Sequence, residues 1–162
     1  MNELETMVDN ISKSVPILEC DLYKNTGMDG LYVDGNILIE KKLYVKDKKV
    51  VLMEEYHHAT YTQGNVLDEK SIDNKKQENF VRRKNFEMLF TSSMIIEGYK
   101  MGFNTFHEVA DYYELPESFI REAIEHYQNK HGLMWNCDQY VIYLGNGIEI
   151  FKNDTSKNIY DI

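Results

Sequence analysis

Two carboxylates and two imidazoles lie within five residues of the chain, at Glu54, Glu55, His57 and His58. On a helix each residue turns about 100° from the last, so His58 projects between Glu54 and Glu55. The opposite side of such a helix is apolar and carries Leu52, Met53, Tyr56 and Ala59. Adjacent carboxylates repel each other and burial raises this cost, whereas a divalent cation or a protonated histidine relieves it. The segment 52–59 therefore predicts a helix with one core face and one candidate metal-binding face.

The same residues also fit less specific roles. Glu54 and His58 are one turn apart, and as an exposed pair they would stabilise the helix by about a few tenths of a kcal/mol. His57 is expected to contact solvent, with metal binding as its alternative. Tyr61, on the side of Glu54, is expected to pack, with a hydrogen bond to a developing oxyanion as its alternative. Surface or capping roles fit the remaining histidines, His107, His126 and His131.

Hydrophobic periodicity and turn residues place this helix in a chain that mixes helices and strands. In chain order we expect a short helix before Pro16, a strand at 17–23, a hairpin at 31–39, a helix at 47–61, a loop to Asn74, two helices over 76–101, helices at 105–113 and 116–130, a second hairpin at 140–151 and a frayed tail. Both hairpins are predicted from glycine and asparagine at their turns. The later helices are predicted from Asn104-Thr105 as an N-cap, Pro116 at a helix start and Gly132 at a helix end.

The composition is that of one globular domain with a small appended lobe: 162 residues, 43% hydrophobic and 28% charged. No apolar run is long enough to span a membrane and the N-terminus lacks a signal pattern, so we expect a cytoplasmic location. A net charge of -9 argues against nucleic-acid binding by the whole surface. Segments 41–49 and 75–84 each carry +4, whereas 102–135 carries -4. We expect solvated helix faces, with a basic front half facing the acidic segment as the alternative.

The motif at 54–58 resembles the H-E-x-x-H helix of zinc proteases, in which two histidines hold the metal and the glutamate is the general base. Here the sequence is E-E-Y-H-H, so Glu54 stands at the first histidine, Glu55 at the base and His58 at the second histidine. Four segments in order resemble the phage and mobile-element branch of the ImmA/IrrE metallopeptidase family. They are MDGLYVDGNILI (28–39), LMEEYHHATYTQGNVLD (52–68), ENFVRRKNFEMLF (78–90) and NTFHEVADYYELPESFIREAIEHYQNKHG (104–132). The resemblance covers about residues 17–132.

This resemblance implies a zinc site whose third ligand is a glutamate early on the following helix. The matching position holds Phe80, with Glu78 half a turn earlier, and Asp68 in the preceding loop is another carboxylate. The candidate ligands are therefore Glu54, His58 and Glu78. A carboxylate in place of a histidine changes the metal preference, so the ion is zinc, another divalent metal or none.

The expected fold is α+β and zincin-like, with a small antiparallel sheet under the active-site helix and a C-terminal helical half containing a helix-turn-helix-like pair. We expect a metallopeptidase-like domain at 1–135 and a hairpin and tail at 136–162. The resemblance implies a phage or mobile-element metallopeptidase that cleaves or inactivates a cognate repressor. The alternative is a catalytically inactive binding module that docks on a repressor or a host defence protein. DNA reading by the two-helix segment is disfavoured, because its second helix carries three glutamates beside a single arginine.

Overall fold

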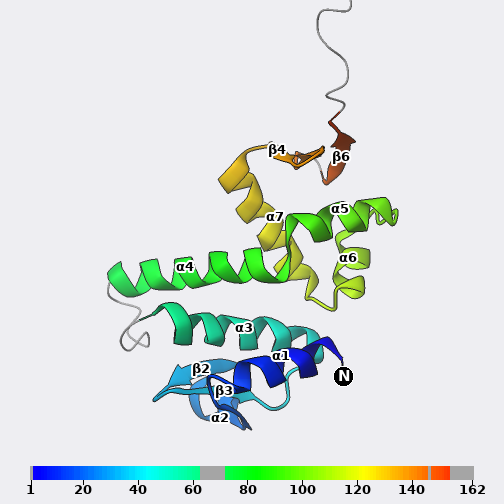
Figure 1. Ribbon diagram of the computed structural model, residues 1–162. Helices are drawn as coiled ribbons and strands as arrows, with labels where there is room; N and C mark the ends of the chain where they lie inside the picture. The colour runs from blue at the N-terminus through cyan, green and yellow to red at the C-terminus, as the bar shows by residue number, and fades with distance from the viewer. Residues whose placement is uncertain (1, 63–71, 146, 154–162) are drawn as a thin grey trace, which may run out of the picture.

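One half of the molecule is a helix-covered sheet, and the other is a cluster of helices that ends in a second sheet (Figure 1). The structure is a computed structural model that describes residues 2–62, 72–145 and 147–153. The first half contains α1 (Glu3–Ser12), β1 (Ile17–Cys20), α2 (Leu22–Thr26), β2 (Gly30–Val33), β3 (Asn36–Glu40) and α3 (Val45–Tyr61). The second half contains α4 (Ile72–Leu89), α5 (Ser92–Lys100), α6 (Phe106–Tyr112), α7 (Glu117–His131), β4 (Met134–Cys137), β5 (Tyr140–Tyr143) and β6 (Glu149–Lys152). The predicted α+β class is confirmed. Of the helices in the described ranges, none is both long and apolar enough to cross a bilayer.

The first sheet has the strand order β1-β3-β2. Strands β2 and β3 form the predicted hairpin, because Asp34 and Gly35 adopt φ values of 49° and 76° that close a two-residue turn. Strand β1 pairs with β3 in parallel, with Ile17 opposite Ile37, so the prediction of an antiparallel sheet is wrong for this strand. The reason is the connection, because β1 ends early and α2, from Leu22, carries the chain across before β2 begins.

Helix α3 lies across the first sheet and covers it (Figure 1). Its predicted apolar side is centred on Leu52, which is 0% exposed and packs with Ile37 and Ile39 of β3 and Ile11 of α1. This cluster fixes the rotation of α3 about its axis. Glu54 and His58 are therefore directed toward α4, whereas Glu55 lies against β2 at Gly30.

Helices α4 to α7 enclose the larger hydrophobic cluster. Phe90 and Ile120 are 0% exposed at its centre, and the second sheet contributes Ile142 and Leu144. The long helical region divides between Leu89 and Ser92 because Thr91 caps the next helix, its hydroxyl accepting from the Met94 backbone N–H. The prediction of two helices over 76–101 is confirmed.

A buried lysine joins the two halves. Lys49 of α3 is 1% exposed, and its Nζ donates to Glu3 Oε2 at 2.6 Å and to the carbonyl oxygen of Tyr113 at 2.9 Å. A buried ammonium is tolerated only when its donors are satisfied. This one side chain therefore fixes both the start of α1 and the end of α6 against α3.

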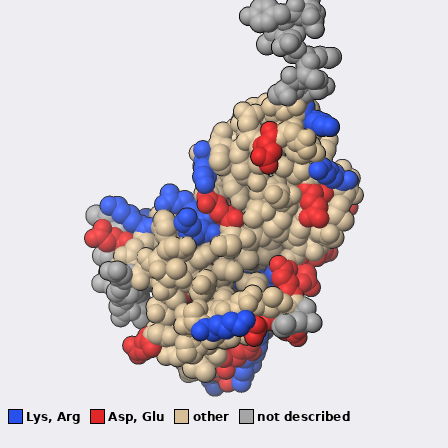
Figure 2. Space-filling model, viewed as in Figure 1, with Lys and Arg blue, Asp and Glu red and all other residues tan. Residues whose placement is uncertain are grey.

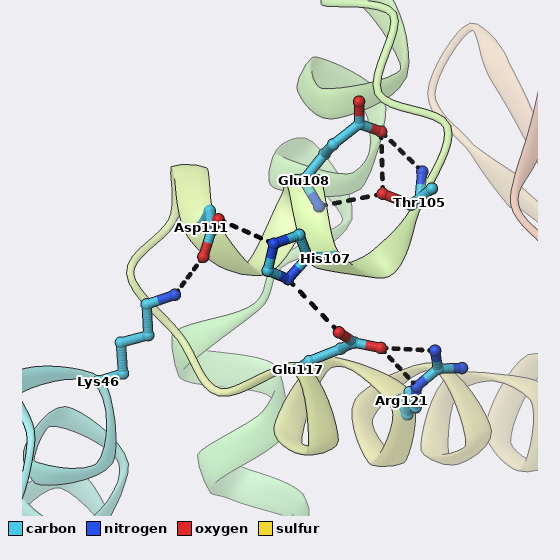
Figure 3. A network of polar contacts seen from close by, with 7 residues as sticks. All are labelled: Lys46, Thr105, His107, Glu108, Asp111, Glu117 and Arg121. Carbon is cyan, nitrogen blue, oxygen red and sulfur yellow. Dashed lines mark hydrogen bonds and ion pairs between the residues drawn. The ribbon is translucent and has the colours of Figure 1, made fainter.

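Helices α6 and α7 form the predicted two-helix pair, held by a polar network (Figure 3). Thr105 caps α6 as predicted, in a reciprocal capping box. His107 lies between Asp111 at 3.3 Å and Glu117 at 3.6 Å. Lys46 of α3 pairs with Asp111, so the network also ties the pair to the first half.

Figure 2 shows Lys and Arg side chains gathered over the part of the surface where α4 lies. This helix contains the basic segment 75–84, and its Arg82 pairs with Glu122 of α7. Together with the Lys46 pair, this contact joins both basic segments to the acidic segment 102–135. These two pairs agree with the alternative of a basic front half facing the acidic segment, whereas Lys41 and Lys48 pair with Asp21 and Glu19 of the first half instead.

The second sheet extends the predicted C-terminal hairpin by one strand. Strands β5 and β6 pair as expected, and β4, which was not predicted, pairs antiparallel with β5. Trp135 in β4 stacks on His131 with ring centroids 4.2 Å apart and on Tyr127 at 4.7 Å. A four-residue run of mixed polarity has little local strand signal, so this packing determines it. The predicted frayed tail falls mainly on 154–162, outside the described residues.

Candidate metal centre

Glu54, His58 and Glu78 come together where α3 passes α4. Glu54 and His58 lie one turn apart on α3, and Glu78 lies in the second turn of α4. Each residue offers one ligand atom, and these atoms all lie within 4.8 Å of one another. The His58 Nε2 atom is 3.6 Å from Glu78 Oε1. The structure thus brings the three predicted ligands into one group.

The dimensions of this group suit a divalent ion after a small closure. Two ligand atoms about 2.1 Å from a tetrahedral zinc ion are about 3.4 Å apart. The His58–Glu78 separation of 3.6 Å is close to this value, and 4.8 Å is the upper limit for the others. Two carboxylates with one imidazole form a donor set that zinc accepts and that manganese also tolerates. The group therefore fits the metal that the resemblance implies.

His58 is buried and prepared for coordination. Its side chain belongs to a residue only 7% exposed, and this burial lowers the pKa of the imidazole. The neutral form is the one that binds a metal. Among the described residues, its Nδ1 atom has no hydrogen-bond partner. The interpretation of Glu54 and His58 as an exposed helix pair is wrong, because α4 packs along this side of α3.

Glu55 lies beside the group and against β2. Burial raises the pKa of its carboxyl to about 8, the Glu54 charge adds to the rise, and the Tyr32 backbone N–H opposes it. A Cβ atom at Gly30 would lie 2.8 Å from Glu55 Cγ, so the glycine in β2 makes the room that Glu55 occupies. A carboxyl with such a pKa exchanges protons near neutral pH, which is what a general base requires.

His57 lies outside the group and inside the protein. It is 2% exposed, so the expected contact with solvent is wrong. Burial lowers the pKa of its imidazole to about 4, and the Lys84 charge contributes. His57 is buried because α3 is covered on two sides, by the sheet and by α4. Its ring centroid is 5.8 Å from that of Tyr61, which supports the packing role expected for the tyrosine.

Phe80, at the position that matches the third ligand of the resembled family, packs instead of coordinating. Its ring meets the Tyr61 ring edge-on at 5.6 Å, and the Lys84 Nζ atom lies 5.5 Å from its centre. Glu78 is the α4 carboxylate that reaches the group. The other candidate, Asp68, lies outside the described residues.

Two further α4 side chains, Arg82 and Asn85, lie beside the group. The sequence left open whether Arg82 pairs with Glu54 or Glu55 or faces water, and it was Asn85 that sequence reasoning missed. Arg82 pairs with Glu122 rather than with a carboxylate of α3. Burial raises the pKa of Glu54, and the Arg82 charge partly offsets this rise. Asn85 is 2% exposed, and its Nδ2 donates to the Val50 carbonyl oxygen at 3.2 Å. The one signal available for Asn85 was an amide on the otherwise apolar inner side of a predicted helix.

The arrangement can hold a divalent ion between two helices, with a proton-exchanging carboxyl group beside it. Comparison of the chain with protein-family models, with curated proteins and with solved structures finds no match. The chemistry of the site therefore rests on the geometry of Glu54, His58 and Glu78 and on the neighbouring Glu55.

Proposed function

We propose that this protein is a metal-dependent peptidase-like protein that cleaves or inactivates a protein partner, the repressor of a phage or mobile element. The observation that carries the proposal is the group of Glu54, His58 and Glu78, with ligand atoms within 4.8 Å of one another. The resemblance to the ImmA/IrrE family supports peptide hydrolysis as the reaction and a repressor as the partner.

In this proposal each residue of the site has a separate role. Glu54, His58 and Glu78 hold zinc or another divalent ion, which would polarise the scissile carbonyl and lower the pKa of a bound water. Glu55 would serve as the general base, taking a proton from the attacking water and returning it to the leaving amine. Burial keeps the His58 imidazole neutral. Gly30 leaves the space in which the Glu55 side chain can stay next to the group.

A second candidate function is docking without catalysis, on a repressor or a host defence protein. Two departures from the resembled motif favour it: Glu54 replaces a histidine, and Phe80 stands where the third ligand is expected. Without a metal, burial would favour the protonated form of Glu55, whose pKa is raised to about 8, and it raises the pKa of Glu54 as well.

A measurement of metal binding distinguishes the peptidase function from the docking function. Chelator-treated protein is titrated with zinc in a calorimeter, and the peptidase proposal expects about one equivalent per chain. His58→Ala should weaken binding at least about a hundredfold, because it removes one of three ligands. His107→Ala is the matched control, since that side chain is 71% exposed on α6 and should bind as the wild type does. Less than about a tenth of an equivalent on the wild type would refute the peptidase proposal.

Cleavage is tested with a repressor encoded beside this protein. Mass spectrometry of the mixture should show defined fragments with the wild type and none with Glu55→Gln. The variant should still bind zinc, because Glu55 is not one of the three ligands. Binding of the repressor without fragments, by wild-type protein carrying zinc, would establish the docking function instead.

A further inference from the structure

A groove with a cavity of about 340 Å³ lies where α3, α4 and the start of α7 meet. This acidic groove is lined by Asp29, Asp47, Glu54 and Glu122, with Arg82 and the buried Asn85. Glu54 is also a member of the candidate metal group, so a chain segment seated in the groove would lie next to that group. The volume is at the lower end of the range of roughly 300–1,000 Å³ for ligand sites and suits one side chain.

The groove has more negative charge than its own residues neutralise. Arg82 is already paired with Glu122. In the described part of the chain, neither Asp29 nor Asp47 takes part in an ion pair. Asp47 lies in the first turn of α3, where the helix dipole stabilises a carboxylate, and Asp29 is exposed to solvent at the mouth of the groove. Both carboxylates therefore lack a cationic side-chain partner among the described residues and can accept one from a bound segment.

Asn85 adds an unused hydrogen-bond acceptor. Its Nδ2 donates to the Val50 carbonyl oxygen at 3.2 Å, which fixes which end of the amide is the oxygen. The Oδ1 atom is buried and has no hydrogen-bond partner among the described residues. A buried acceptor left unpaired is unfavourable, so a donor is what this wall of the groove lacks. The same wall contains Phe86, whose ring packs on that of Phe119 of α7 with the centroids 5.2 Å apart, so the aliphatic part of a long side chain would meet apolar surface.

We propose that the acidic groove binds the cationic side chain, arginine in preference to lysine, of the protein segment on which the neighbouring site acts. The chemical class follows from the two carboxylates without a cationic partner, the unpaired acceptor and the apolar walls taken together. Arginine carries donors at several fixed directions, so it can meet an amide oxygen and a carboxylate at once. Cleavage or inactivation of the bound segment rests on the proposed function. Binding of its cationic side chain by the acidic groove does not.

The test uses the full chain in chelator and two pentapeptides, Ac-Ala-Ala-Arg-Ala-Ala-NH2 and the same peptide with norleucine in place of arginine. Backbone amide shifts are followed by NMR during titration. The arginine peptide should shift the amides of Val51, Phe86 and Ser118, which line the groove, whereas the norleucine peptide should not. Raising the salt concentration should weaken the binding, because the attraction is partly between exposed charges. Equal affinity for both peptides would overturn the proposal.

A double variant tests the carboxylates. Asp29→Asn with Asp47→Asn should weaken the arginine peptide about fivefold or more, since two partly exposed charge contacts are lost. The matched control is Asp34→Asn with Asp138→Asn, which makes the same change in charge outside the groove. Both control positions have a φ near 50°, which asparagine accepts as well as aspartate does. A double variant that binds like the control would overturn the proposal.

The acceptor is tested separately with Asn85→Leu, which should also weaken the arginine peptide, with circular dichroism to check the fold. Zinc titration of the same samples keeps the groove and the proposed function distinguishable. Arginine-selective binding without zinc binding supports the groove and refutes the metal site. Zinc binding without arginine selectivity refutes the groove and leaves the metal site standing.

Discussion

The buried carboxyl of Glu55 should dominate how the stability of the metal-free protein depends on pH. Its pKa is raised from 4.5 to about 8, with burial as the largest cause. Between these two values the folded state holds a proton that the unfolded state has lost, so the free energy of unfolding falls as the pH rises. At roughly 1.36 kcal/mol per pH unit, the loss reaches about 3 kcal/mol at pH 7 and about 5 kcal/mol above pH 8.

Glu55→Gln removes this titration and keeps an acceptor for the Tyr32 backbone N–H. Urea unfolding in chelator, followed by circular dichroism from pH 5 to 8.5, gives the free energies of both proteins. The variant should match the wild type near pH 5 and exceed it by several kcal/mol at pH 8.5. Other buried groups, such as His57, titrate in both proteins and largely cancel in the difference. A difference that stays within about 1 kcal/mol across this range would refute the reasoning.

Three further variants test other contacts by the same urea unfolding at pH 7. Lys49→Ala should lower the free energy of unfolding by about 2–4 kcal/mol, because it removes a buried stem and leaves the Tyr113 carbonyl without this donor. Gly30→Ala should cost about 1–3 kcal/mol, since its Cβ would lie 2.5 Å from Val51 Cγ1. Thr105→Ala should cost about 1 kcal/mol through loss of the α6 cap. A variant as stable as the wild type would contradict the role given to that contact.

Features with a local signal could be predicted from the sequence. The hairpin at Asp34-Gly35 follows from its turn residues, and the start of α6 follows from Thr105. The parallel pairing of β1 with β3 and the existence of β4 could not be predicted. Both depend on contacts between distant residues, such as Ile17 with Ile37 and Trp135 with His131. The strand propensity of a short segment does not depend on distant residues, so it cannot predict such contacts.

The candidate site also has features that the sequence predicts and features that it does not. The spacing of Glu54 and His58 placed both on one side of a helix, and the resemblance added Glu78, which the structure brings to them. The burial of His57 and the groove wall formed by Asn85 were not predictable. A single helix does not reveal that a second helix will cover its flank, and α4 does this to α3.

The ligands of the candidate metal group are attached to two different hydrophobic clusters. Leu52 anchors α3 in the cluster of the first sheet, whereas Phe86 anchors α4 in the cluster of the helical half. An ion held by both helices would act as a clasp across this boundary, and linkage makes the effect reciprocal. A partner whose binding separates the two clusters must lower the affinity for the ion. The ion must lower the affinity for that partner by the same factor. The fall in ion affinity on docking would therefore report how strongly a partner favours separation of the two clusters.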